Sequence, residues 1–156
     1  MYASLVSFCD QQLGRVLDVF DEHNLWQDTL LLVNTDHGFL MGEHDWWAKV
    51  VTPFFQEVAH IPFWVYDPRI PECVNTTSQA LAQTIDLAPT VLDYFDIPVP
   101  PDMQGRRLLD AMRGDDAIRS ASLYGVMGGQ VNVTDGRYVY MRGCATRMQL
   151  QLLLAL

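Results

Sequence analysis

Residues 29–49 read TLLLVNTDHGFLMGEHDWWAK and place an apolar run directly before a crowd of ionisable side chains. The continuous apolar character of residues 29–34 predicts a β-strand covered on both faces, as in a parallel sheet between helices. In open α/β sheets, ligands bind beyond the carboxyl ends of such strands. The stretch therefore predicts an α/β fold with a site in the loop that follows the strand.

The rest of the chain supports this fold class. Apolar side chains recur at helical spacing over residues 3–23, and His23-Asn24 ends that predicted helix. IPFWVY, residues 61–66, is a second predicted strand. Further helices are predicted over residues 86–95, with Asp86 as the N-cap, and over residues 106–112.

The last third of the chain has a different pattern. SLYGVM, QVNVT and RYVYMR are short strand-like runs separated by Gly-Gly and Asp-Gly turns, which predicts a small antiparallel β region. We therefore expect three parts, which are an α/β part (1–100), a short helix with antiparallel strands (101–143), and a tail of uncertain order (144–156).

Composition narrows the possible partners. The 156 residues hold 19 acidic and 10 basic side chains, a formal charge of −9. Such an acidic surface repels nucleic acids and anionic membranes, so we expect neither as a partner. The three cysteines have no Cys-x-x-Cys spacing, which argues against a disulfide framework and a zinc-thiolate site. Cellular location and oligomeric state stay open.

The loop itself offers metal ligands and a cation. Asp36 supplies hard oxygen atoms suited to Ca²⁺, Mg²⁺ or Mn²⁺, and an adjacent His37 shifts the balance towards Mn²⁺ or Zn²⁺. Lys49 can bind an oxyanion, and His44 can donate to a leaving-group oxygen or cap the loop. The alternative is a plain turn, in which Asp36 accepts backbone N–H bonds and Gly38 takes positive φ.

Two tryptophans follow in the same loop. We expect Trp46 and Trp47 to pack beneath the loop, and a substrate platform is the alternative.

The order of motifs resembles the sulfatase family of the alkaline-phosphatase-like superfamily. TLLLVNTDHGFLMGEHDWWAK followed by HIPFWVYDP is similar to that family's strand, its Asp-His-Gly and Gly-Glu-His turns, its lysine and its next strand. Three further stretches agree in order, namely FCDQQLGRVLDVFDEHNLWQDT, TIDLAPTVLDYFDIPVPPDMQGRRLL and NVTDGRYVYMRG. The resemblance spans about residues 2–143. It implies part of an alkaline-phosphatase-like α/β sandwich with a small C-terminal antiparallel β region.

The resemblance also implies roles. Asp36 and His37 would be ligands of a divalent metal, with Ca²⁺ the first expectation and Mn²⁺ or Mg²⁺ the alternatives. Lys49 would be the catalytic residue that contacts the sulfate oxygens. His44 receives no role from the resemblance and is a weaker candidate for substrate binding. The implied substrate is a small-molecule or saccharide sulfate ester, hydrolysed by a metal-dependent sulfuric ester hydrolase.

Two parts of the family pattern are absent from this sequence, namely the nucleophile motif and the early strand whose paired aspartates supply the other metal ligands. Most sulfatases use a formylglycine nucleophile made from Cys or Ser in Cys/Ser-x-Pro-x-Arg, and none of Cys9, Cys73 and Cys144 stands in that motif. We therefore expect the chain to be a C-terminal portion of a sulfatase, inactive alone, whose nucleophile lies upstream. The alternatives are a phosphodiesterase or phosphonate monoester hydrolase of the same superfamily, and a non-catalytic truncated module.

Overall fold

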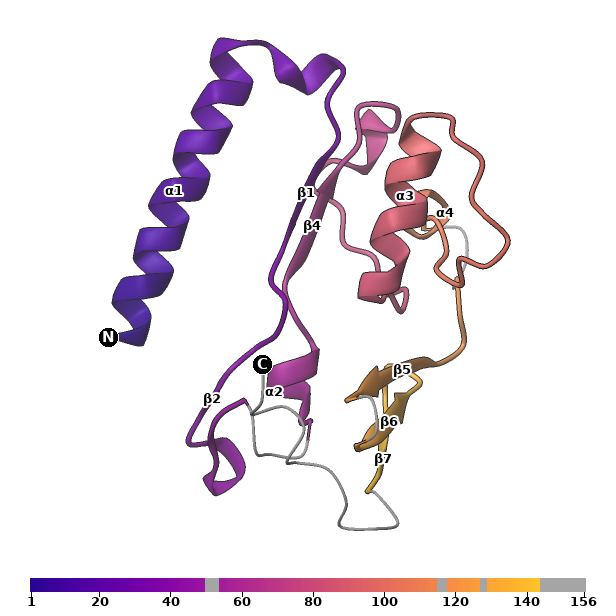
Figure 1. The fold of residues 1–156 in the computed structure, drawn as a ribbon. Coiled ribbons are helices and arrows are strands. Elements are labelled where there is room, and N and C mark those ends of the chain that lie inside the picture. The colour runs from indigo at the N-terminus through magenta and orange to yellow at the C-terminus, as the bar shows by residue number, and fades with distance from the viewer. Residues whose placement is uncertain (50–53, 115–117, 127–128, 144–156) are drawn as a thin grey trace. The chain divides into compact units, whose positions relative to one another are not determined.

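A computed structural model describes residues 1–49, 54–114, 118–126 and 129–143 (Figure 1). The chain divides into two compact units, the first formed by Met1–Val33 with Trp64–Val74, and the second by Asn34–Phe63 with Asn75–Leu156. Each unit is described separately. The mixture of helices and short strands confirms the predicted α/β class, while the predicted three-part division stays a prediction. Its tail, residues 144–156, lies outside the described residues.

The first unit is built around a long helix and an aromatic cluster. The predicted helix is present as α1 (Tyr2–Glu22) and ends at His23, followed by Asn24 with a positive φ of 58°. A short 3-10 turn, η1 (Leu25–Gln27), brings Trp26 back against Phe20, with ring centroids 4.8 Å apart. Trp26 Nε1 also donates to Asp21 Oδ1 at 2.7 Å, so the turn is tied to the end of the helix.

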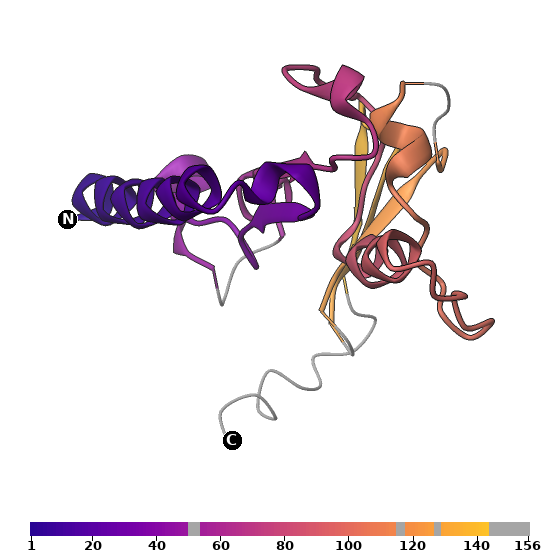
Figure 2. The same cartoon turned by 90° about the horizontal axis from the view of Figure 1, so that it is seen from above.

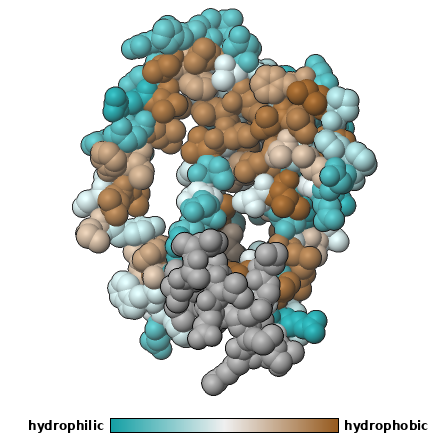
Figure 3. All heavy atoms as spheres, in the orientation of Figure 1, coloured by the Kyte–Doolittle hydropathy of each residue, from teal (hydrophilic) through white to brown (hydrophobic). Residues whose placement is uncertain are grey.

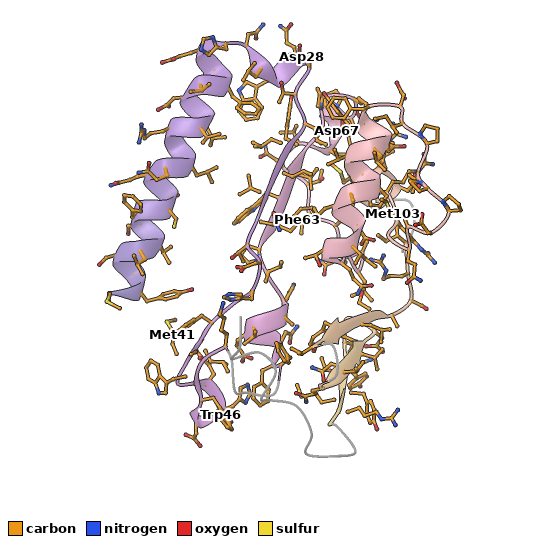
Figure 4. All side chains as sticks on the ribbon, in the orientation of Figure 1. Asp28, Met41, Trp46, Phe63, Asp67 and Met103 are labelled. Atoms are coloured by element: carbon orange, nitrogen blue, oxygen red, sulfur yellow. The ribbon has the colours of Figure 1, made fainter. Side chains whose placement is uncertain are left out.

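Strands β1 (Leu31–Asn34) and β4 (Phe63–Tyr66) pair with each other, and η3 (Pro71–Cys73) follows. Tyr66 Oη, at the end of β4, donates to Trp26 O at 2.6 Å, and the two rings meet edge to face. The end of β4 thus lies beside the segment that leads into β1, and Figure 4 shows Asp28 and Asp67 at the same end of the pair. The two strands therefore run in opposite directions.

The expectation of a parallel, fully covered strand is corrected by this geometry. Leu31, Leu32 and Val33 are half-buried. An apolar run of this kind reports burial but does not encode strand direction, which depends on the distant partner.

Much of the apolar surface of α1 is exposed. Phe20 is buried, whereas Leu5, Val6, Phe8 and Val16 are exposed. Figure 3 shows apolar side chains, in brown, beside hydrophilic ones along this helix. Within the described residues, no helix has the length and apolar content needed to span a membrane.

The second unit begins with the loop that holds the predicted site. β2 (Leu40–Met41) and β3 (Trp47–Ala48) form a short antiparallel hairpin with Leu40 opposite Ala48. The turn between them contains η2 (Glu43–Asp45), and a short helix, α2 (Gln56–Ala59), comes later. Leu40 is fully buried and anchors the hairpin. Figure 4 labels Met41 and Trp46 on this hairpin. The hairpin was not predicted from the sequence.

A helical layer follows in the same unit. The helix predicted over residues 86–95 is present as η4 (Thr84–Asp86) and α3 (Leu87–Tyr94), and α4 (Leu109–Met112) is a shorter form of the predicted later helix. Leu108, Ala111 and Ile118 form the buried core, with Phe63 packed against it.

Asp86 is the N-cap of α3, as predicted, but its side chain makes no capping hydrogen bond to that helix. Asp86 is fully buried, and its oxygens accept from Gln83 N at 2.7 Å and Arg106 N at 2.8 Å, and from the Arg119 guanidinium at 2.5 and 2.6 Å. The Arg119 cation and two backbone donors occupy the carboxylate in place of the first-turn amides of α3, because a buried carboxylate must have its charge compensated.

The predicted antiparallel region is confirmed. β5 (Ser122–Gly125), β6 (Val131–Thr134) and β7 (Val139–Arg142) form a three-stranded antiparallel sheet in sequence order. Figures 1 and 2 show the strands side by side. The register places Asn132 opposite Tyr124 on one neighbour and Met141 on the other. Asn132 is fully buried, and this face of the sheet is the inner one.

Candidate functional site

The loop after β1 turns back on itself at Asp36. Asp36 Oδ1 accepts from His37 N at 3.0 Å, and Thr35 Oγ1 lies 3.4 Å from the same oxygen. The other oxygen, Oδ2, lies 3.4 Å from His37 Nε2. One carboxylate oxygen is therefore used to shape the turn, and the other is available to the site.

The His37 ring is oriented by the neighbouring backbone. Its Nδ1 lies 2.8 Å from Gly38 O. A carbonyl oxygen can only accept, so Nδ1 carries a proton, and in the neutral form of the ring Nε2 presents a lone pair. A metal-ligating histidine is fixed by the same kind of bond. In that form Nε2 and Asp36 Oδ2 face each other with lone pairs, so a cation beside them is favourable.

Lys49 supplies that cation. Its Nζ contacts His37 Nε2, and Lys49 is the only lysine of the sequence. Desolvation raises the pKa of Asp36, but the fields of His37 and Lys49 and the backbone hydrogen bonds together lower it below its ordinary value. Asp36 is therefore ionised at neutral pH, as a metal ligand must be. The structure thus brings together Asp36, His37 and Lys49.

The hairpin explains how Lys49 returns to His37 across twelve residues. Gly42, His44, Asp45 and Ala48 all have positive φ. Glu43 Oε2 accepts from Met41 N at 2.6 Å and stabilises the tight turn. Non-glycine residues at positive φ are unfavourable and concentrate at functional sites. The strand pairing aims Lys49 at the loop where β1 ends.

Gly38 is required by close packing, and φ is not the reason. A Cβ at this position would lie 1.9 Å from Glu57 O, and Gly38 N donates to Val58 O at 2.8 Å. The expected positive φ is absent, since Gly38 is not among the left-handed glycines of the described chain. Segment 57–58 therefore forms a wall directly against the loop of Asp36 and His37.

His44 lies in a different set of contacts. Its ring stacks on Phe55 with centroids 3.9 Å apart and 14° between the planes, and Nε2 lies 3.2 Å from Glu57 Oε1. Phe55 and Glu57 were missed in the sequence. The available signal was weak, since Glu57 is a single carboxylate in the mostly apolar stretch that runs from Phe54 to Tyr66.

The tryptophans of the loop point outward more than expected. Trp46 is 40% exposed and Trp47 is 69% exposed. Packing beneath the loop is therefore wrong for Trp47, because the two-residue strand β3 holds it at the edge of the hairpin. An exposed indole keeps the alternative use as a binding platform open.

The donor set suits a hard divalent cation but is small. Asp36 Oδ2 and His37 Nε2 provide one oxygen and one nitrogen, and Ca²⁺ takes six to eight donors. Among the residues that the structure describes, no three His, Cys, Asp or Glu side chains are grouped so that they could hold a metal ion. Asp36 and His37 thus fit part of a metal site, and water or groups beyond the described residues must complete it.

Comparison with known proteins gives a consistent family. The family model described as Sulfatase matches residues 1–97. The N-acetylglucosamine-6-O-sulfatase of Bacteroides thetaiotaomicron is 29% identical over 114 residues, which are 73% of this chain and 20% of that protein. The multifunctional alkaline phosphatase superfamily protein PehA of Trinickia caryophylli is 31% identical over 108 residues, or 69% of this chain and 21% of that protein. The chain thus spans about a fifth of the length of these curated relatives.

A solved structure agrees in fold. The structure of BT4656 in complex with its substrate, D-glucosamine-2-N,6-O-disulfate, matches with a TM-score of 0.71 and 24% sequence identity. The match covers 85% of this chain and 28% of the other. The observed α/β arrangement is therefore one found in part of a larger protein.

Proposed function

The chain belongs to the sulfatase family, and we propose that its Asp36–His37–Lys49 cluster is part of the active site of a metal-dependent sulfuric ester hydrolase. The observation that carries the proposal is the meeting of three groups at one point, namely Asp36 Oδ2, His37 Nε2 and the Lys49 ammonium. Two lone-pair donors beside one mobile cation are what a site for a metal ion and an oxyanion requires.

The proposed ligands divide the work. Asp36 and His37 would hold the divalent cation, with Ca²⁺ first and Mn²⁺ or Mg²⁺ as alternatives, since a carboxylate favours hard ions. When bound, the cation supplies positive charge that polarises the ester oxygens. The Gly38 O hydrogen bond holds His37 Nδ1 and keeps Nε2 free for ligation. Lys49 then binds a sulfate oxygen and stabilises the negative charge that develops as the ester bond breaks.

The proposed substrate is a sulfate ester of a sugar or another small alcohol. A sulfate monoester carries a single negative charge, whereas a phosphate monoester carries about −1.5 to −2 at neutral pH. A chain of net charge −9 with a single lysine in its loop suits the weaker anion. The sulfated sugars of the relatives support a saccharide, and the exposed Trp47 provides an apolar surface for a sugar ring.

We further propose that the 156 residues alone are inactive. None of the three cysteines stands in the family's nucleophile motif, and the described residues provide two metal donors. The formylglycine nucleophile and further ligands would be supplied by other parts of a longer protein. His44 is not assigned a chemical step, because its ring is held by Phe55 and Glu57.

A second candidate is hydrolysis of phosphodiesters or phosphonate monoesters. The likeness to a multifunctional alkaline phosphatase superfamily protein favours it, and a phosphodiester carries the same single charge as a sulfate monoester. A non-catalytic module is the third possibility, and the absence of anion binding would favour it.

Lys49→Met tests the anion half of the site. In the presence of saturating Ca²⁺, we expect the wild-type chain to bind nitrophenyl sulfate more tightly than a nitrophenyl phosphodiester, as measured by isothermal titration. Lys49→Met should weaken sulfate-ester binding by roughly tenfold or more, because a charge-assisted hydrogen bond contributes about 1.5–3 kcal/mol.

Arg137→Met is the matched control. It removes one cation from an exposed turn and gives the chain the same net charge as Lys49→Met. If both variants lose the same affinity for the sulfate ester, the effect of Lys49→Met is due to net charge alone, which would contradict the proposal. Tighter binding of the phosphodiester would favour the second candidate. Turnover of nitrophenyl sulfate that Asp36→Ala abolishes would refute the proposed inactivity of the chain alone.

A further inference from the structure

Two amide side chains of the C-terminal sheet hold the main chain of a single residue. Gln130 Oε1 accepts from Phe54 N at 3.3 Å, and Asn132 Nδ2 donates to Phe54 O at 2.9 Å. Residues two apart on an extended chain point to the same face, so both amides reach the same segment. Phe54 is bonded as if it were paired with another strand, although no backbone ladder reaches it in the described chain.

The two amide side chains stand on closely packed strands. Asn132 is fully buried in the middle strand of the sheet, and Val126 N donates to Gln130 O at 3.1 Å across the β5–β6 hairpin. A Cβ at Gly125 would lie 2.1 Å from Gln130 O, so the two strands approach as closely as glycine permits. Leaving the buried Asn132 amide N–H unpaired would be costly, so its bond to Phe54 O stabilises this contact.

The residues that follow Phe54 carry the contacts to the proposed site. Phe55 stacks on His44, and Glu57 Oε1 lies 3.2 Å from His44 Nε2. Val58 O accepts from Gly38 N, directly beside His37. One short segment, residues 54–58, thus joins the C-terminal sheet to both arms of the loop.

We propose that Gln130 and Asn132 are positioning residues for this site, acting through Phe54. The amide clamp, defined as these two side chains on the Phe54 main chain, fixes the place of Phe55 and Glu57 and thereby the orientation of the His44 ring. The same clamp supports Val58 against Gly38. The catalytic importance of this arrangement rests on the proposed function, whereas the orientation of His44 does not.

The test compares two near-isosteric variants that remove the clamp, Gln130→Met and Asn132→Leu. A stacked phenyl ring shifts the proton signals of the imidazole beneath it, so the nuclear magnetic resonance signal of the His44 ring reports the stack. The signal is identified with His44→Gln, and Phe55→Leu gives its position without the stack. We expect either clamp variant to move the His44 signal at least half of the way to the Phe55→Leu position.

Two controls separate positioning from general damage. Val133→Ala weakens the same strand from its opposite face and should leave the His44 signal in place. Gln130→Glu keeps an acceptor for Phe54 N and should retain most of the wild-type signal. Gln130 is only half-buried, so its variant folds if the buried Asn132→Leu variant does not.

An unchanged His44 signal in a folded Gln130→Met chain would overturn the clamp. So would a shift of equal size in Val133→Ala. As a second readout, Ca²⁺-dependent binding of nitrophenyl sulfate should fall severalfold in the clamp variants. Failure of the Lys49→Met test would refute the proposed function while leaving the His44 result intact.

Discussion

Asp86→Asn should destabilise the second unit by about 3–5 kcal/mol, the usual effect of breaking a buried ion pair by removing one partner. Asp86 is fully buried, and the Arg119 guanidinium binds both of its oxygens at 2.5 and 2.6 Å. The substitution leaves the largely buried Arg119 without its counter-charge. Urea unfolding at neutral pH, followed by circular dichroism, gives the free energy of unfolding.

The effect of Asp86→Asn should also depend on pH in a defined direction. Desolvation raises the pKa of Asp86, but the hydrogen bonds from Arg119, Arg106 N and Gln83 N outweigh it and lower the pKa below its ordinary value. A lowered folded-state pKa means that the stabilisation is present above the unfolded value of about 3.9 and is lost as pH falls through the folded value. The difference between wild type and variant should therefore shrink below about pH 4.

Asp110→Asn is the control for this prediction. Asp110 Oδ2 lies 3.4 Å from Arg107 Nε, and both side chains are about half exposed. Its loss should change the stability by no more than about 0.5 kcal/mol. Equal effects of Asp86→Asn and Asp110→Asn, or a pH-independent difference, would show that the Asp86–Arg119 pair is not buried as described.

Gly38→Ala should be the most damaging small substitution in the site loop. The added Cβ would lie 1.9 Å from Glu57 O and 3.1 Å from Val58 Cα, so main-chain atoms must move. We expect a loss of about 3 kcal/mol, at the upper end of the usual cost of overpacking. The hydrogen bond from Gly38 N to Val58 O should also be lost, and with it the placement of His37.

Gly143→Ala is the matched control, because a Cβ there meets no atom of the described residues within 4 Å. Its stability should stay within about 0.5 kcal/mol of wild type. Urea unfolding measures the stability of both variants, and hydrogen exchange of the backbone amide at position 38 reports the bond to Val58 O. A Gly38→Ala chain as stable as Gly143→Ala, with the same exchange protection, would contradict the close approach of Glu57.

The sequence was sufficient to predict those elements whose pattern lies within a few neighbouring residues. The helix α1 and the strand β1 follow from periodicity and apolar runs, and the antiparallel order of β5, β6 and β7 follows from short turns between them. The choice of Asp36, His37 and Lys49 came from their crowding after a strand and from the resemblance to a family. Their meeting in space required the hairpin, which was not predicted.

The missed features share a physical cause. The β2–β3 hairpin has two residues in each strand and depends on positive φ at His44, Asp45 and Ala48, which propensities disfavour. Interacting side chains also lie far apart in the sequence, with His44 and its partner Glu57 separated by 13 positions and Asp86 and its partner Arg119 by 33. Charge compensation across such distances is decided by tertiary packing, so the sequence indicated Asp86 as the N-cap of α3 but not its pairing with Arg119.

The single lysine offers the most direct test of the central claim that Asp36 and His37 hold a cation beside Lys49. In a chain with isotope-labelled lysine, one side-chain signal reports Lys49 alone. Titration with Ca²⁺ should shift that signal to saturation, because the metal and the ammonium compete for the lone pair of His37 Nε2. With so few protein donors, the dissociation constant should be weak, on the order of 10⁻³ M. Asp36→Asn should abolish the saturable shift. A Lys49 signal that does not respond to Ca²⁺ or Mn²⁺, or that responds equally in Asp36→Asn, would contradict the proposed metal and oxyanion site.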